Sequence, residues 1–163
     1  MISDEYRWTL LVVLIIIFQY FVSLIIGGSP RRSIFTQEWM DKNFGKEHEA
    51  AFKGKDQIGK GGYPDHGNGR YAAKLDYASW MKFALAQRVH YNFLENIMQV
   101  STGLLMCGLY DSKIATYIGV VYLLGRTIFT IGYQISPKAR FYGLPFMMLP
   151  QMLLPIYTIY CLN

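Results

Sequence analysis

The sequence predicts an all-α integral membrane protein built as a four-helix up-down bundle. Its 163 residues are 52% hydrophobic, and the apolar residues gather in long runs instead of being spread along the chain. Residues 8–26 and 141–162 carry no charged side chain. Each run is long enough to cross about 30 Å of hydrocarbon as a helix. Residues 77–109 and 114–135 form two further apolar runs that contain a few polar residues.

From these runs we expect helices near residues 6–28, 76–109, 112–135 and 140–162, with short turns after the second and third. Ser29-Pro30 is predicted to end the first helix, because proline cannot donate a hydrogen bond to the preceding turn. The whole chain, residues 1–163, is expected to form one transmembrane domain with an insert at residues 33–76.

The insert is long and polar. Short helices are compatible with residues 37–43 and 47–52, whereas residues 59–70 are rich in glycine and turn-forming residues and are expected to be irregular. His48, Asp65 and His66 do not have metal-ligand spacing, so we expect solvated loop residues and no metal site.

Positive charge is concentrated in two connections. Residues 28–76 carry nine Lys or Arg side chains, and Lys138 and Arg140 lie in the third connection. The positive-inside rule places both connections in the cytosol and both termini on the far side. The seven acidic residues in the first connection weaken this argument, and the basic excess equally suits anionic lipid or an anionic ligand. Nothing in the sequence indicates a nucleic-acid partner.

A polar stripe runs along the second predicted helix. Arg88, Asn92 and Glu95 fall within about 60° of one another on a helix. A charge at bilayer depth costs about 2.5–3.5 kcal/mol. These side chains are therefore expected to line a site, or else to form a structural network that joins helices.

The third predicted helix is apolar first and polar in its second half, where Arg126 and Tyr133 share a face. Both polar halves lie on the side of the two basic connections, as a cytosol-facing anion site requires. Two other interpretations stay open: Arg126 extending to the membrane interface, and Tyr133 anchoring the helix there.

These residues resemble the MAPEG family, the membrane-associated proteins of eicosanoid and glutathione metabolism. The resemblance combines an R-x-x-x-N-x-x-E pattern at residues 88–95 with G-R-x-x-[FY]-x-x-G-Y at residues 125–133. It covers residues 1–32 and 75–145.

The resemblance implies a four-helix transmembrane fold that assembles as a homotrimer, with glutathione bound between subunits on the cytosolic side. It assigns the following residues to glutathione as co-substrate: Arg31, Arg32, Arg88, His90, Asn92, Glu95, Arg126 and Tyr133. Arg140 aligns without a gap with the arginine assigned to thiol activation in one family member.

The chemistry of these side chains agrees with that assignment. Arginine forks bind carboxylates, and Glu95 can accept from an ammonium group. A thiol with a pKa of about 8.5 is only a few per cent thiolate at pH 7, so an arginine beside the sulfur would favour the reactive anion.

Two residues depart from the family pattern. By this resemblance, Phe129 stands where several relatives have tyrosine, and Asn96 stands where one family member has another tyrosine. The insert is also longer than the short loop of those relatives. The expected function is that of a membrane glutathione transferase or peroxidase acting on lipophilic electrophiles or lipid hydroperoxides. The alternatives are a catalytically silent subunit of a larger membrane complex and a regulatory protein that presents a lipid. The expected location is the endoplasmic reticulum, with a mitochondrial membrane as the alternative.

Overall fold

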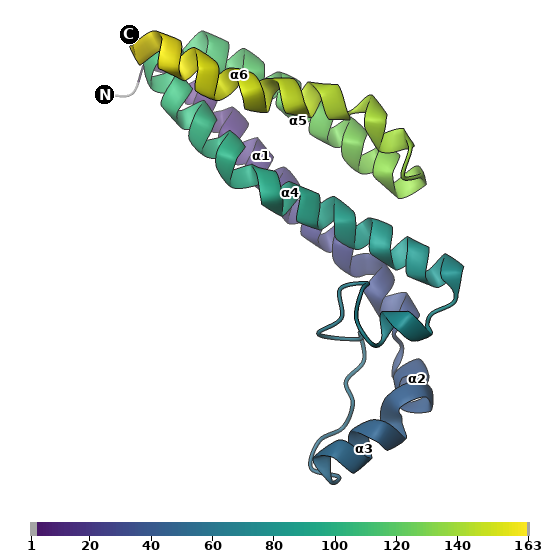
Figure 1. The fold of residues 1–163 in the computed structure, drawn as a ribbon. Helices are drawn as coiled ribbons and strands as arrows, with labels where there is room; N and C mark the ends of the chain where they lie inside the picture. The colour runs from purple at the N-terminus through teal and green to yellow at the C-terminus, as the bar shows by residue number, and fades with distance from the viewer. Residues whose placement is uncertain (1–2, 163) are drawn as a thin grey trace. The chain divides into compact units, whose positions relative to one another are not determined.

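The computed structural model describes residues 3–162, which form helices and connecting loops. The chain divides into two compact units. Unit 1 comprises Met1–Ser23 with Tyr91–Asn163, and unit 2 comprises Leu24–His90. Figure 1 shows the four long helices and, in blue, the short helices of the insert.

The long helices are α1 (Asp4–Ile34), α4 (Tyr77–Tyr110), α5 (Ser112–Ile135) and α6 (Leu144–Leu162). They confirm the four predicted helices, with α6 starting after a short 3-10 turn, η3 (Ala139–Tyr142). Among the described residues, α1, α5 and α6 are long and apolar enough to cross a membrane. The fourth long helix, α4, exceeds them in length but carries the charged stripe.

The predicted end of the first helix at Ser29-Pro30 is wrong. Helix α1 continues past Pro30 for another turn. Arg31 and Phe35, which follow the proline, are both buried in unit 2. Their packing holds the helical path and offsets the hydrogen bond that Pro30 cannot donate.

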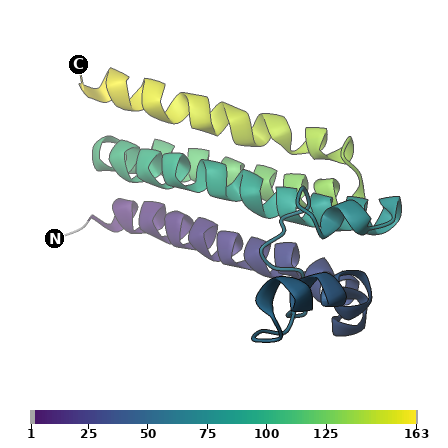
Figure 2. The ribbon, with the colours of Figure 1, turned by 60° about the horizontal axis from the view of Figure 1, so that its bottom comes forward.

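In unit 1 the helices pack closely at glycines. A Cβ atom on Gly119 of α5 would lie 2.6 Å from Val12 of α1 and 3.1 Å from Leu104 of α4. A Cβ atom on Gly125 would lie 2.5 Å from Phe146 of α6. Helices α5 and α6 run antiparallel beside each other (Figure 1, Figure 2). The absence of side chains at these glycines therefore sets the approach of the backbones.

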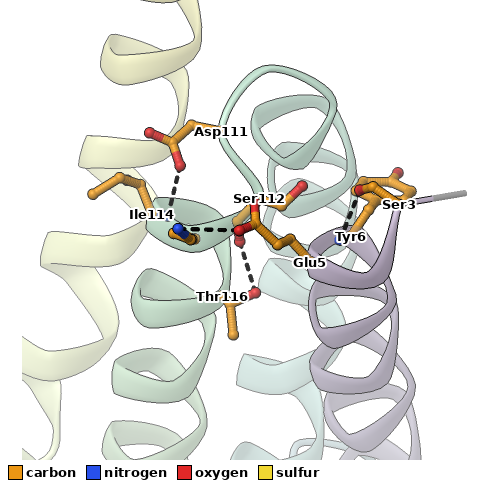
Figure 3. A network of polar contacts seen from close by, with 8 residues as sticks. Ser3, Glu5, Tyr6, Asp111, Ser112, Ile114 and Thr116 are labelled. Carbon is orange, nitrogen blue, oxygen red and sulfur yellow. Dashed lines mark hydrogen bonds and ion pairs between the residues drawn. The ribbon is translucent and has the colours of Figure 1, made fainter.

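A polar network lies where α4 meets α5 (Figure 3). Asp111 caps α5 by accepting a hydrogen bond from the Ile114 backbone N–H at 3.0 Å. The Thr116 hydroxyl donates to the Ser112 carbonyl at 2.7 Å. Thr9 of α1 donates to the same carbonyl at 3.1 Å, which fastens α1 to the start of α5.

Unit 2 has its own hydrophobic core. The insert contains α2 (Gln37–Met40), a π-helical stretch η1 (Asp41–Gly45), α3 (Lys46–Phe52) and a 3-10 turn η2 (Ala72–Lys74). The short helices predicted at 37–43 and 47–52 are thus confirmed, and residues 59–70 have no regular element, as expected. The hydrophobic core of unit 2 is formed by Phe35, Met40, Phe44, Ile58 and Phe83.

The expectation that Asp65 is a solvated loop residue is wrong. Asp65 is only 6% exposed. Its carboxylate accepts hydrogen bonds from the backbone N–H groups of Gly67, Gly69 and Ala72 at 2.8, 3.0 and 2.7 Å. Burial alone would raise the pKa of Asp65, but these hydrogen bonds outweigh it and lower the pKa below its ordinary value of 3.8. Asp65 thus organises the irregular part of the insert.

Asp65→Asn should destabilise unit 2 at neutral pH by about 1–3 kcal/mol, because backbone donors lose a charged acceptor. A lowered folded-state pKa means that this stabilisation is present above the unfolded-state pKa and is lost as the pH falls through the folded-state pKa. The variant should therefore show less loss of stability below pH ~4 than the wild type.

Thermal unfolding followed by tryptophan fluorescence measures this effect, since Trp39 and Trp80 both belong to unit 2. Glu38→Gln removes an exposed acid from the same unit and is the control. If Asp65→Asn and Glu38→Gln show the same dependence of the unfolding temperature on pH, the structural role of Asp65 is contradicted.

Candidate functional site

The predicted polar stripe lies along a single helix, α4. Arg88 and Glu95 are exposed in the isolated chain, and Asn92 between them is half-buried. Because α4 is continuous from Tyr77 to Tyr110, the three side chains share one helical face as the sequence spacing predicts. This face offers a cation, an amide and a carboxylate in a row.

Arg126 is the most deeply buried charged group among the described residues, with 0% exposure. Its Nη1 atom donates to the side-chain oxygen of Asn92 at 2.6 Å. Its guanidinium carbon lies 4.2 Å from the ring centre of Phe93 and 5.0 Å from that of Phe129. The Asn92 oxygen and two aromatic faces thus contribute to holding the cation within unit 1.

This contact fixes the orientation of the Asn92 amide. Its oxygen accepts from Arg126, which leaves the NH₂ end of Asn92 as the end that can donate to a ligand. Arg126 is fully buried in this chain, and the structure shows it in contact with Asn92.

Arg140 and Tyr133 form a second polar contact in unit 1. The Nη1 atom of Arg140 donates to the Tyr133 hydroxyl at 3.1 Å. Tyr133 is buried near the end of α5, and Arg140 is half-buried in η3. The two residues predicted from the third helix and the third connection are therefore brought together.

His90 and the preceding Gln87 lie where α4 approaches α1 within unit 2. The Gln87 side chain donates to the Gly27 carbonyl at 2.6 Å. A Cβ atom on Gly27 would lie 3.0 Å from the Cβ of His90. Gln87 was not among the predicted site residues. Gln87 directly precedes Arg88 and therefore lies on a different face of the helix from Arg88, Asn92 and Glu95. Its helical position could have indicated a contact with another helix.

Arg31 is engaged within the insert. It is 3% exposed, and its Nη1 atom donates to the carbonyls of Gly61 at 2.9 Å and Gly62 at 3.1 Å. Its Nη2 atom donates to the Asp65 carbonyl. The guanidinium carbon also lies 4.1 Å from the Tyr63 ring centre.

These contacts favour a structural role for Arg31, since three carbonyl oxygens occupy its fork. The neighbouring Arg32 is exposed, so of this predicted pair it is the side chain with access to solvent. Sequence spacing treats the two arginines alike, because the loop that captures Arg31 lies 30 residues further along the chain.

Comparison with known protein families places the chain in one of them. Residues 8–160 match the MAPEG family. The chain belongs to the MAPEG family. MAPEG proteins are membrane proteins, and the family includes glutathione transferases and related enzymes. No curated protein is significantly similar to the chain.

MAPEG family proteins use glutathione, which carries two carboxylates, an ammonium group and a thiol. The described residues contain no group of three or more His, Cys, Asp or Glu side chains placed to hold a metal ion.

Arg31→Lys should loosen the insert, because an ammonium group cannot reproduce the fork that donates to Gly61, Gly62 and Asp65. Amide hydrogen exchange at residues 61–72 should quicken about tenfold, corresponding to ~1.4 kcal/mol. Arg32→Lys, the adjacent exposed arginine, should leave that exchange within twofold of wild type. If both variants behave alike, Arg31 does not anchor the loop.

Proposed function

We propose that this MAPEG protein is a membrane glutathione transferase or glutathione-dependent peroxidase that acts on lipophilic electrophiles or lipid hydroperoxides. The observation that carries the proposal is the polar face of α4, whose central Asn92 is oriented by the buried Arg126. Its sequence motifs resemble those of microsomal glutathione S-transferase type 3 and, more distantly, leukotriene C synthase.

In this proposal the α4 stripe holds the peptide part of glutathione. Arg88 binds a carboxylate, the Asn92 NH₂ group donates to a carbonyl or carboxylate, and Glu95 accepts from the ammonium group. His90 and Arg32 are further candidate contacts from the sequence. Such a face, exposed in one chain, fits a homotrimer in which a neighbouring subunit covers it.

Arg140 is the proposed catalytic residue. Glutathione supplies the thiol that attacks an electrophilic carbon or a peroxide oxygen. The guanidinium of Arg140 favours the thiolate by placing a fixed positive charge beside the sulfur, and each unit of lowered thiol pKa corresponds to about 1.4 kcal/mol. An apolar second substrate would arrive from the bilayer, where it is already dissolved.

The remaining details belong to the same proposal. The long helices would cross the membrane four times, with the two basic connections in the cytosol and the endoplasmic reticulum as the host membrane. A mitochondrial membrane is the alternative.

A second candidate function is a catalytically silent subunit of a larger membrane complex. Two features favour it: the family resemblance places a tyrosine of several relatives at Phe129, and the insert has a hydrophobic core of its own. Glutathione-dependent turnover by the purified trimer would separate the two candidates.

Arg88→Ala should weaken glutathione binding by more than about tenfold, because it removes the cation proposed to bind a glutathione carboxylate. It should also lower the thermal stability of the assembly, because Glu95 then has no positive charge from Arg88 on the same helical face. Isothermal titration and thermal unfolding in detergent measure the two effects. Lys82→Ala, at an exposed position on the same helix, is the control. Wild-type affinity in Arg88→Ala would make the stripe purely structural.

Arg140→Ala is expected to lower kcat about tenfold to a hundredfold while changing the affinity for glutathione far less, as for an interaction strongest in the reacting state. The ultraviolet absorbance of the bound thiolate should then appear only at higher pH. Lys138→Ala, two residues earlier and exposed, should titrate like wild type. An unchanged thiol pKa would remove Arg140 from catalysis, whereas no thiolate signal in any variant would favour the silent subunit.

A further inference from the structure

We infer that Tyr133 acts as a positioning residue for Arg140: its hydroxyl and ring hold the guanidinium that the proposed reaction uses. This inference rests on the proposed function. It assigns Tyr133 a different role from direct contact with glutathione, the role that the sequence resemblance implies.

The first support is the way the guanidinium is held. The Arg140 Nη1 atom donates to the Tyr133 hydroxyl at 3.1 Å. The guanidinium carbon lies 5.3 Å from the ring centre of Tyr133 and 5.1 Å from that of Phe141. Tyr133 itself is 7% exposed and so has little freedom to move. A buried oxygen acceptor thus fixes one edge of the cation, while two rings limit its displacement.

The second support is the rigid backbone around Arg140. A Cβ atom on Gly132 would lie 2.5 Å from the Ala139 carbonyl oxygen, and one on Gly143 would lie 2.3 Å from the Phe129 backbone nitrogen. The turn that carries Arg140 therefore rests directly on the backbone of α5. In addition, the Ala139 N–H donates to the Ser136 hydroxyl oxygen at 3.1 Å.

Since the backbone of Arg140 is fixed in this way, the freedom that remains belongs to its side chain. An arginine side chain has many rotamers, and that freedom is lost when the guanidinium is fixed beside a sulfur anion. Holding the guanidinium before the thiol arrives removes part of that cost from the reaction. The Tyr133 hydroxyl performs this task through an oxygen acceptor that phenylalanine lacks.

A second arginine in unit 1, Arg126, also lies over an aromatic ring but takes its oxygen acceptor from a different residue. Arg126 lies over Phe129, one helical turn before Tyr133, and the two rings are 5.4 Å apart. Arg126 takes its oxygen acceptor from Asn92, whereas Arg140 takes it from the ring partner itself. The loss of a hydroxyl at position 129 therefore leaves the Arg140 contact intact.

The test is a double-mutant cycle in the full-length protein purified in detergent. It compares wild type, Tyr133→Phe, Arg140→Ala and the double variant, with Tyr142→Phe as the control because Tyr142 is exposed in the same turn. The measurements are the pH titration of bound glutathione thiolate and the separate values of kcat and KM. Phenylalanine retains the buried ring, so the fold should survive.

Tyr133→Phe should lower the thiolate fraction at neutral pH about threefold to tenfold and reduce kcat by a similar factor, with KM for glutathione changed less than about twofold. Adding Tyr133→Phe to Arg140→Ala should have no further effect, since the two residues act through one guanidinium. Additive losses, or a wild-type titration in Tyr133→Phe, would overturn the inference.

A readout without glutathione separates this inference from the proposed function. In ¹⁵N NMR of the detergent-solubilised protein, the guanidinium of Arg140 should rotate measurably faster in Tyr133→Phe than in wild type and in Tyr142→Phe. Equal rotation rates would overturn the positioning role even if the protein is active. A wild-type protein without any thiolate signal would instead contradict the proposed transferase, while the NMR comparison still decides whether Tyr133 holds Arg140.

Discussion

A guanidinium group removed from water must find oxygen acceptors, and this requirement shapes both units of the protein. In unit 2, Arg31 is surrounded by the carbonyls of Gly61, Gly62 and Asp65. In unit 1, Arg126 bonds to Asn92 and lies over two phenylalanine rings. The first arrangement folds the insert around the end of α1, and the second joins α4 to α5. Because each arginine is held by residues distant in sequence, neither could be moved without rearranging the segments that surround it.

The helices and the polar face of α4 could be predicted from the sequence because both follow from spacing within a single segment. Apolar run length gives helix position, and i, i+4, i+7 spacing places Arg88, Asn92 and Glu95 on one face. The contacts between segments could not be predicted in this way. Arg31 and Arg32 are equivalent in the sequence, and a loop thirty residues away distinguishes them. Asp65 stands in a glycine-rich stretch typical of mobile loops, yet three backbone donors converge on its carboxylate. Pro30 indicates a helix end in the sequence, but α1 continues past it because Phe35, which follows, is buried in the core of unit 2.

The insert is a folded part of this MAPEG chain. Its aromatic core joins Phe35 to Phe83 of α4, the buried Arg31 lies in the last turn of α1, and the buried Asp65 lies in the irregular loop. The family match runs from residue 8 to residue 160 and includes the insert. A membrane protein with little exposed polar chain has few surfaces in water, so a compact insert gives this protein a distinct aqueous surface.

The lengths of α1 and α4 have a consequence for the surrounding lipid. At about 1.5 Å per residue, the 31 residues of α1 extend ~46 Å and the 34 residues of α4 extend ~51 Å. The hydrocarbon layer is only about 30 Å thick, so both helices are longer than a crossing requires, whereas the 24 residues of α5 nearly match it. A membrane helix that is longer than the hydrocarbon layer relieves the mismatch by tilting, and a thicker bilayer reduces both the mismatch and the tilt. Sterol-rich membranes are thicker than sterol-poor ones, so the same helices would tilt less in the first than in the second. The thickness of the bilayer would therefore change the tilt angles of the helices.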